Sequence, residues 1–174
     1  MPPIAPTPEG MAAFHMPVIS AVDSAFVREA RVGRLATATL AGEPHLVPVC
    51  FVFDGSVFYT AVDAKPKRVE PSRLRRVQNI RANPRAALLL DRYEEDWSRL
   101  RYVLVRGRAE VLGPGSEQAR AIALLREKYP QYRAMPGFGE APIIRLTPER
   151  VVSWSPMREA RKGGQGPIRG GRRG

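Results

Sequence analysis

The chain has 174 residues, 44% of them hydrophobic and 26% charged, which is typical of a single globular domain and excludes wholesale disorder and two large domains. Its one cysteine, Cys50, cannot form an internal disulfide, and no histidine or cysteine cluster has the spacing of metal ligands, so no metal site is predicted. No apolar run reaches the roughly 18 residues of a membrane span, and residues 1–10 lack the features of a signal peptide, so we expect a cytoplasmic protein without membrane contact.

The net charge of +11 is concentrated in two segments. Residues 157–174 hold six basic residues against one acidic residue, and residues 65–85 hold eight against one. Proline is frequent in residues 1–19, and glycine alternates with arginine in residues 163–174, which is typical of segments that do not fold by themselves. We therefore predict a flexible arm over 1–19, a folded domain over 20–156 and a flexible basic tail over 157–174.

The first half of the domain is expected to contain one helix and three strands. Ser20 or Asp23 can cap a helix that ends before Gly33. Runs of apolar and β-branched residues then predict strands over 35–40, 46–53 and 57–62. Because Gly42 and the pair Asp54–Gly55 mark tight turns between these runs, we expect a three-stranded antiparallel meander.

The second half is expected to add two helices and four strands. Residues 72–82 place Leu74, Val77 and Ile80 on one helical face, and Asn83–Pro84 ends that helix. Ser116 is expected to cap a further helix that carries Ile122, Leu125 and Tyr129, and strands are predicted over 86–91, 102–112, 142–146 and 150–154. Since alternating βαβ units are absent, we predict a mainly β protein, a small barrel of six or seven antiparallel strands with a few helices.

No arrangement of catalytic side chains stands out in the sequence. No serine lies in a Gly-x-Ser-x-Gly elbow, and no phosphate-binding glycine motif follows a strand. His45 is expected to be a pocket or surface residue of a strand, and Glu94–Asp96 a solvated acidic loop. Cys50 is expected to be either inert packing or a contact in a cofactor wall. We therefore predict no catalytic triad and no acid–base pair.

Three cations follow the strand that ends at Val62. Lys65, Lys67 and Arg68 lie within four residues, shortly before the helix expected from Ser72. Cationic side chains and the N–H groups of a helix start can act together on one phosphate. The pattern predicts a phosphate-binding loop, with a solvated basic face as the alternative.

The order of these segments resembles the pyridoxamine-phosphate-oxidase-like split-barrel flavoproteins over roughly residues 21–156. The strings that carry the resemblance are Pro44–Val49, Phe58–Thr60, Asn83–Arg85 and Val105–Glu110. Within that family, Asp63–Lys67 together with Asp91–Trp97 is most similar to an actinobacterial subgroup of F420-dependent oxidoreductases. The resemblance implies an FMN-binding split β-barrel of Greek-key type, assembled as a homodimer with two cofactor sites in the groove between the subunits.

The resemblance also implies a set of cofactor-binding residues drawn from two subunits. In one subunit, strand residues line an isoalloxazine-like ring and the basic loop holds the phosphate. The other subunit contributes aromatic side chains. The implied set is Pro48, Val49, Cys50 and Phe51 along the ring, Tyr59 and Thr60 on the neighbouring strand, Lys65, Lys67 and Arg68 at the phosphate, Trp97 and Tyr102 near the other subunit's contribution, and Trp154 near the ring edge.

On this resemblance we expect an oxidoreductase that transfers a hydride between the deazaflavin coenzyme F420 and a small organic acceptor such as an enone, a quinone or a tetrapyrrole. The cofactor would carry the chemistry, which accounts for the lack of a catalytic motif. Water, Tyr59 or Tyr102 could supply a proton. FMN is the alternative cofactor, because it has the same phosphate and a similar ring. F420 is favoured over FMN because its acidic tail would be attracted by four nearby arginines, Arg73, Arg75, Arg76 and Arg81.

The sequence bears on three other functions. Pyridoxamine phosphate oxidases follow a late tryptophan with an Arg-x-His-Arg segment, whereas Trp154 is followed by Ser155–Glu159 without a histidine, so the vitamin B6 reaction is not predicted. A non-enzymatic flavin-binding or haem-binding split-barrel protein is the alternative from a different class. The tail over 163–174 could bind nucleic acid weakly and in a salt-dependent way. Nucleic acid is not an expected main partner, because the basic residues lack interleaved aromatic side chains.

Overall fold

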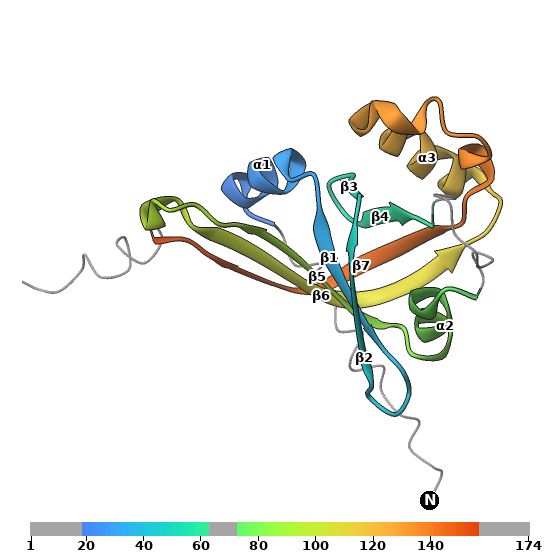
Figure 1. Ribbon diagram of the computed structural model, residues 1–174, viewed down its shortest axis with the longest axis horizontal. Coiled ribbons are helices and arrows are strands. Elements are labelled where there is room, and N and C mark those ends of the chain that lie inside the picture. Colours follow the sequence, from blue (N-terminus) through green and yellow to red (C-terminus); the bar gives the residue numbers. More distant parts are fainter. Residues whose placement is uncertain (1–18, 63–72, 157–174) are drawn as a thin grey trace, which may run out of the picture.

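A computed structural model describes residues 19–62 and 73–156, which form one curled sheet with helices packed around it (Figure 1). The elements are α1 (Ala21–Glu29), β1 (Gly33–Ala38), β2 (Pro44–Val49), β3 (Val52–Phe53), β4 (Phe58–Ala61), α2 (Arg75–Ala82), β5 (Arg85–Arg92), η2 (Trp97–Arg99), β6 (Arg101–Leu112), α3 (Ser116–Lys128), η3 (Pro130–Tyr132), η4 (Phe138–Glu140) and β7 (Ile143–Trp154). The predicted arm and tail lie outside the described residues, apart from Ile19. No helix of residues 19–62 and 73–156 is long and apolar enough to span a bilayer.

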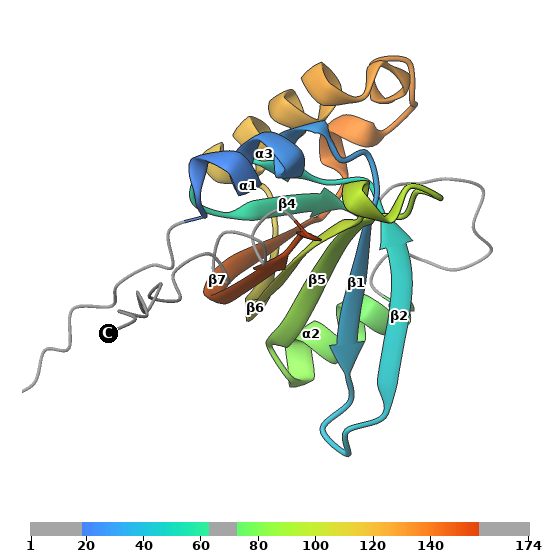
Figure 2. The same ribbon diagram turned by 90° about the vertical axis from the view of Figure 1, so that its left-hand side faces the viewer.

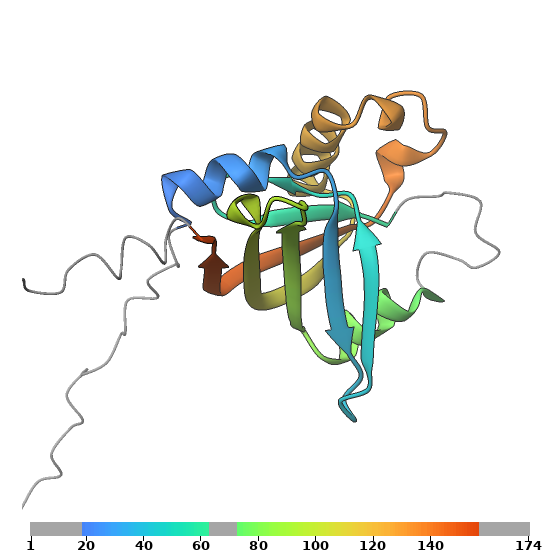
Figure 3. The ribbon, with the colours of Figure 1, turned by 60° about the vertical axis from the view of Figure 1, so that its left-hand side comes forward.

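The described strands form one antiparallel sheet in the order β2-β1-β5-β6-β7-β4-β3. β2 and β3 follow each other in the chain, with only Cys50 and Phe51 between them, yet they lie at opposite ends of this order. The sheet must therefore curl until its two ends meet, as the views in Figures 2 and 3 show. This confirms the prediction of a mainly β split barrel of six or seven antiparallel strands, and the described sheet has seven.

The predicted meander is wrong in one respect. The expected strand over 46–53 is two strands, and β4 pairs with β3 and β7 rather than with β2. The N–H of Phe51 is bonded to the Tyr129 hydroxyl (3.1 Å) instead of joining a ladder. Since apolar residues continue through Val49–Phe53, nothing local in the sequence marks this break.

The two strands expected over 142–146 and 150–154 are a single strand, β7, which pairs with β6 along its length. The register shifts between Arg106 and Gly107, so the segment around Pro148 is a β-bulge rather than a turn. A Cβ atom at Gly107 would collide with the carbonyl of Thr147. Glycine at this position therefore allows the close approach of the two strands.

The core has two parts, one on each face of β4. Phe58 and Val62 pack inside the barrel, together with Phe51, whereas Tyr59 and Ala61 pack against α3 on the other face. All four residues of β4 are buried, because the strand lies between these two clusters. Val77 and Ile80 are buried in the barrel core, as predicted for the apolar face of the second helix.

The start of α1 is held by a buried aspartate. Ser20 is the cap, since its hydroxyl accepts a hydrogen bond from the N–H of Asp23 (3.1 Å). The Asp23 carboxylate, only 3% exposed, accepts bonds from Arg101 on β6 (2.9 Å) and Ser153 on β7 (2.9 Å). These contacts attach α1 to the end of the sheet where the expected aromatic residues lie.

Candidate cofactor-binding site

The segment expected to line the cofactor ring lies where β2 ends and β3 begins. Val49 and Phe51 point into the barrel core and are 8% and 0% exposed. Pro48 is exposed, and Cys50 is a half-buried free thiol that packs against the second core cluster. Val49 and Phe51 therefore form the wall behind the segment, and Pro48 and Cys50 are the side chains that a ligand outside the barrel can reach.

β2 has an open edge beside this segment, because among the described strands it pairs only with β1. In an antiparallel pair, residues alternate between positions that bond the neighbouring strand and positions that point away from it. Pro44, Leu46 and Pro48 are alternate residues of β2, so their main-chain groups point to the same side of the strand. Because the two prolines have no N–H to donate to β1, this side is the open edge. Free main-chain groups next to Cys50 fit the polar edge of an isoalloxazine-like ring.

Tyr129, the residue that follows α3, holds the break between β2 and β3 in place. The Tyr129 hydroxyl accepts a hydrogen bond from the N–H of Phe51 (3.1 Å) and donates to the carbonyl of Phe51 (2.8 Å) or of Arg31 (2.9 Å). Burial raises the pKa of Tyr129 to about 12, so the hydroxyl keeps its proton at neutral pH. Lys128 places its ammonium group 4.1 Å from the centre of the Phe51 ring.

Lys128 has an unusual environment for a cation. Its Nζ atom is buried and has no hydrogen-bond partner among residues 19–62 and 73–156. Burial lowers its pKa to about 8, and the nearby Arg31 guanidinium adds to this effect. The ring faces of Phe51 and Tyr129 favour the charged form, and the nearby Cys50 also raises the pKa of Lys128.

We expect Tyr129→Phe to destabilise the protein, because the buried N–H of Phe51 loses its partner. An unsatisfied buried donor costs about 2 kcal/mol. Urea denaturation should show the loss as a lower midpoint at an unchanged slope. Tyr93→Phe is the matched control, since the Tyr93 side chain is 66% exposed and should change the midpoint little. An unchanged midpoint for Tyr129→Phe would contradict the role of this hydroxyl.

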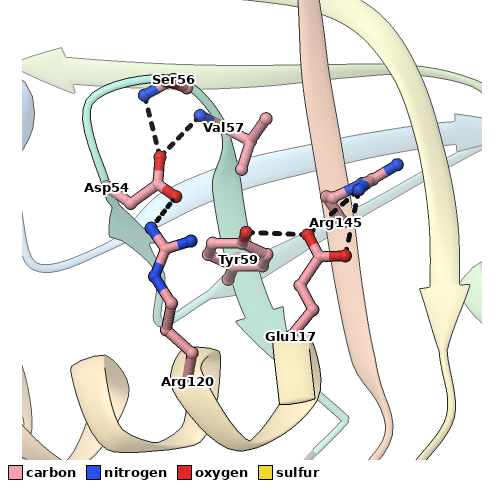
Figure 4. Close-up of polar contacts among 7 residues, drawn as sticks. All are labelled: Asp54, Ser56, Val57, Tyr59, Glu117, Arg120 and Arg145. Atoms are coloured by element: carbon pink, nitrogen blue, oxygen red, sulfur yellow. Dashed lines mark hydrogen bonds and ion pairs between the residues drawn. The ribbon is translucent and has the colours of Figure 1, made fainter. Parts of the chain in front are cut away.

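Tyr59 and Thr60 lie on β4, but their side chains point in opposite directions. Thr60, 7% exposed, faces the barrel core. The Tyr59 hydroxyl faces α3, where it donates a hydrogen bond to Glu117 Oε1 (2.9 Å; Figure 4). Burial raises the pKa of Tyr59 to about 12, and the bond to Glu117 adds to this effect.

Glu117 is itself held by Arg145 on β7. Two bonds of 3.0 and 3.1 Å join Arg145 Nη1 to the carboxylate, and they lower the pKa of Glu117 below its ordinary value together with the bond from Tyr59. Nearby, Asp54 accepts bonds from the N–H groups of Ser56 (2.8 Å) and Val57 (2.9 Å) and from Arg120 on α3 (Figure 4). Burial alone would raise the pKa of Asp54, but these bonds hold it below its ordinary value. The network fixes α3 against β4 and β7.

The predicted phosphate-binding cations, Lys65, Lys67 and Arg68, lie outside the described residues. The described chain resumes with Arg73, and Arg75 and Arg76 form the first turn of α2. That turn has no acidic residue. In chain order, a cationic helix therefore follows the predicted phosphate loop, beginning at Arg75.

The three aromatic residues of the implied set lie on β6, on β7 and in η2, the turn that joins β5 to β6. The rings of Tyr102 and Trp154 stack with centroids 6.2 Å apart, and Trp97 in η2 is 68% exposed. Pro48, Arg34, Leu89, Leu104 and Val152 lie in one row across β2, β1, β5, β6 and β7. Trp154 is therefore at the same end of the strands as Cys50 but four strand spacings away, up to about 19 Å. Within one chain the structure does not bring these aromatics to the break between β2 and β3.

His45 lines a polar cavity of about 110 Å³ between the β1–β2 hairpin and α2, in agreement with its prediction as a pocket or surface residue. The acidic loop is mostly exposed, as expected, with Glu94 joined to Arg99 at 2.9 Å. Sequence reasoning did not single out Tyr129, Glu117 or Arg145. Their partners lie 78, 58 and 28 residues away in the chain, so no local pattern marks them.

Residues 21–155 match the protein family described as pyridoxamine 5'-phosphate oxidase. The chain belongs to this family. It is also 31% identical over 133 residues to the 5a,11a-dehydrotetracycline/5a,11a-dehydrooxytetracycline reductase of Streptomyces rimosus. That alignment covers 74% of this chain and 78% of the reductase. The family resemblance inferred from the sequence motifs is therefore confirmed.

Solved structures share the fold. A conserved hypothetical protein from Mycobacterium tuberculosis has a TM-score of 0.62 and 25% identity, over 88% of this chain and 93% of that chain. HutZ, the haem storage protein of Vibrio cholerae, has a TM-score of 0.58 and 17% identity, over 76% and 90% of the two chains. An F420 reductase has a TM-score of 0.54 and 20% identity, over 74% and 94%. At these identities HutZ and the F420 reductase show the fold alone.

Proposed function

We propose that this protein is an oxidoreductase that uses the deazaflavin F420 to reduce a conjugated double bond in a small organic acceptor. The observation that carries the proposal is the break between β2 and β3, where an open strand edge lies beside the reachable side chains of Pro48 and Cys50. The 31% identity to a reductase of a dehydro compound supports reduction as the reaction class. The string Asp91–Trp97 supports F420, because it resembles the F420-dependent subgroup.

The chain's own residues would bind and orient the cofactor, which when bound supplies the hydride. Pro48, Cys50 and the free main-chain groups of β2 would contact the ring, and Val49 and Phe51 would keep that wall rigid from within the core. Lys65, Lys67 and Arg68 would bind the phosphate. Trp97, Tyr102 and Trp154 of a second copy would cover the ring and exclude water.

The contacts of Tyr59 argue against its use as the proton donor. Its hydroxyl already donates to Glu117, and its pKa of about 12 opposes release of the proton. Tyr102 of the second copy, or a water molecule, is the better candidate proton donor, because Tyr102 lies near the surface with its ring stacked on Trp154.

A homodimer is part of the proposal, since β1, β5 and β6 separate the β2–β3 break of one chain from its own Trp154 on β7. The outward face of the sheet carries an apolar strip that fits a second copy. Leu46 is 62% exposed, and Leu89, Leu104 and Val152 lie half-buried in register across β5, β6 and β7. Light scattering on the purified protein should give twice the mass of the 19.3 kDa chain.

Titration of the purified protein with F420 and with FMN tests the proposed function. We expect F420 to bind with a dissociation constant below about 100 μM, which corresponds to about 5.5 kcal/mol, and FMN to bind more weakly. Tighter binding of FMN would mean that the cofactor is FMN and not F420. Failure of both to bind in this range would contradict an oxidoreductase that uses either cofactor.

A further inference from the structure

The polar cavity between the β1–β2 hairpin and α2 is separate from the ring-lining segment and from the aromatic residues. It has a volume of about 110 Å³, and one water needs only about 10–15 Å³ on this measure, so a group of several heavy atoms fits. Asn79 lies buried at its base, and Arg75 and Glu43 are exposed at its rim. The full lining is Thr39, Glu43, Pro44, His45, Arg75 and Asn79.

Hydrogen bonds hold both walls of the cavity in place. On the helix side, Asn79 Nδ2 donates to the Thr37 hydroxyl on β1 (3.1 Å). On the hairpin side, Thr39 and Glu43 are joined by a main-chain bond of 3.0 Å and by a bond of 3.1 Å from the N–H of Glu43 to the Thr39 hydroxyl. The cavity is therefore formed in advance of any ligand, which lowers the ordering cost of binding.

The charge of the cavity favours an anion. Arg75 and Glu43 are 3.4 Å apart, longer than the 2.7–2.9 Å of a strong charge-assisted bond, and their side chains are 56% and 66% exposed. Such a surface pair is weak. Among the described residues the one side-chain hydrogen bond of Arg75 is that to Glu43, and α2 has three arginines and no acidic residue. A carboxylate can displace Glu43 from Arg75 at little cost.

The lining also carries acceptors, which decides the ligand class. Glu43 and the amide oxygen of Asn79 can accept hydrogen bonds, while Arg75 and His45 can donate them. A chain of carboxylates joined by amide groups uses both kinds of group, whereas a bare phosphate uses only donors. We propose that this cavity binds a carboxylate of the oligoglutamate tail of the deazaflavin. This inference rests on the proposed function, and it makes the cavity the feature that separates F420 from FMN, which has no such tail.

The test measures dissociation constants for two forms of the deazaflavin, one with its full oligoglutamate tail and one trimmed to the phosphate-bearing core. For Arg75→Gln we expect about tenfold weaker binding of the tailed form and a change below about twofold for the trimmed form. For Glu43→Gln we expect the opposite sign, with the tailed form bound about threefold more tightly, because a competitor for Arg75 is gone. Arg28→Gln, an exposed cation on α1, is the matched control and should change neither constant.

The outcomes separate this inference from the proposed function. If Arg75→Gln weakens both forms equally, Arg75 acts on the phosphate and the tail site is wrong. If the wild-type protein binds the tailed and trimmed forms equally, the cavity binds no tail and the inference falls while the proposed function stands. If the wild-type protein binds neither form, both fall. Since Arg75 and Glu43 are exposed, their variants should fold, and thermal denaturation confirms this before titration.

Discussion

Replacing Lys65, Lys67 and Arg68 together by glutamine should weaken F420 binding by about a hundredfold or more. A hydrogen bond between a cation and a phosphate contributes about 1.5–3 kcal/mol, and the removal of two such bonds corresponds to at least about a hundredfold in the dissociation constant. These residues lie between β4 and α2 in the chain. Titration of wild type and variant with the deazaflavin, at two salt concentrations, measures the change. The variant should also show a weaker dependence on salt.

The control removes three positive charges elsewhere. Arg169, Arg172 and Arg173 lie in the predicted tail, and their replacement by glutamine should leave the affinity within about twofold if the effect is local rather than one of net charge. A second variant, Arg76→Gln on α2, separates two locations for the phosphate. If Arg76→Gln abolishes binding while the triple variant retains it, the first turn of α2 binds the phosphate and the loop prediction is wrong.

Local patterns predicted the helices and the fold class well, although the cap of α3 is Gly115 and not the predicted Ser116. The apolar face with Val77 and Ile80, the cap at Ser20 and the turn at Asp54–Gly55 all depend on residues close together in the chain, and the structure confirms each of them. The break at Cys50–Phe51 depends instead on Tyr129, 78 residues away from Phe51. Pro148 illustrates the opposite case, since a proline typical of a turn lies in a bulge of a continuous strand opposite Gly107.

The candidate site was predictable only in part, for a related reason. Alternation along a strand indicates that Val49 and Phe51 share one face and that Pro48 and Cys50 share the other, but it cannot say which face the core covers. The structure answers this through the packing of Phe51 against Phe58, with ring centroids 6.0 Å apart. The hydrogen bond from Tyr59 to Glu117 could not be predicted either, because α3 follows β4 by more than fifty residues. Contacts of this kind are set by topology and leave no local mark.

A subunit-mixing experiment tests whether each site uses two chains. One parent variant carries the Lys65, Lys67 and Arg68 replacements, and the other carries Trp97→Ala and Tyr102→Ala. Each parent dimer should bind F420 at least about tenfold more weakly than wild type, since stacking on an aromatic side chain contributes about 1–3 kcal/mol. In a mixed dimer, isolated with two different affinity tags, one site combines the intact loop of one chain with the intact aromatics of the other. That dimer should bind about one cofactor with wild-type affinity.

The reciprocal pairing gives the opposite result and makes the test decisive. A chain that carries all five replacements, paired with a wild-type chain, leaves neither site intact if loop and aromatics come from different subunits, because each site then contains one defective part. If both parts came from the same chain, this dimer would keep one good site and the first mixed dimer would have none. Because β1, β5 and β6 lie between β2 and β7 of one chain, we expect the shared arrangement. The stacked pair of Tyr102 and Trp154 in one subunit would then act on a ring bound by its partner.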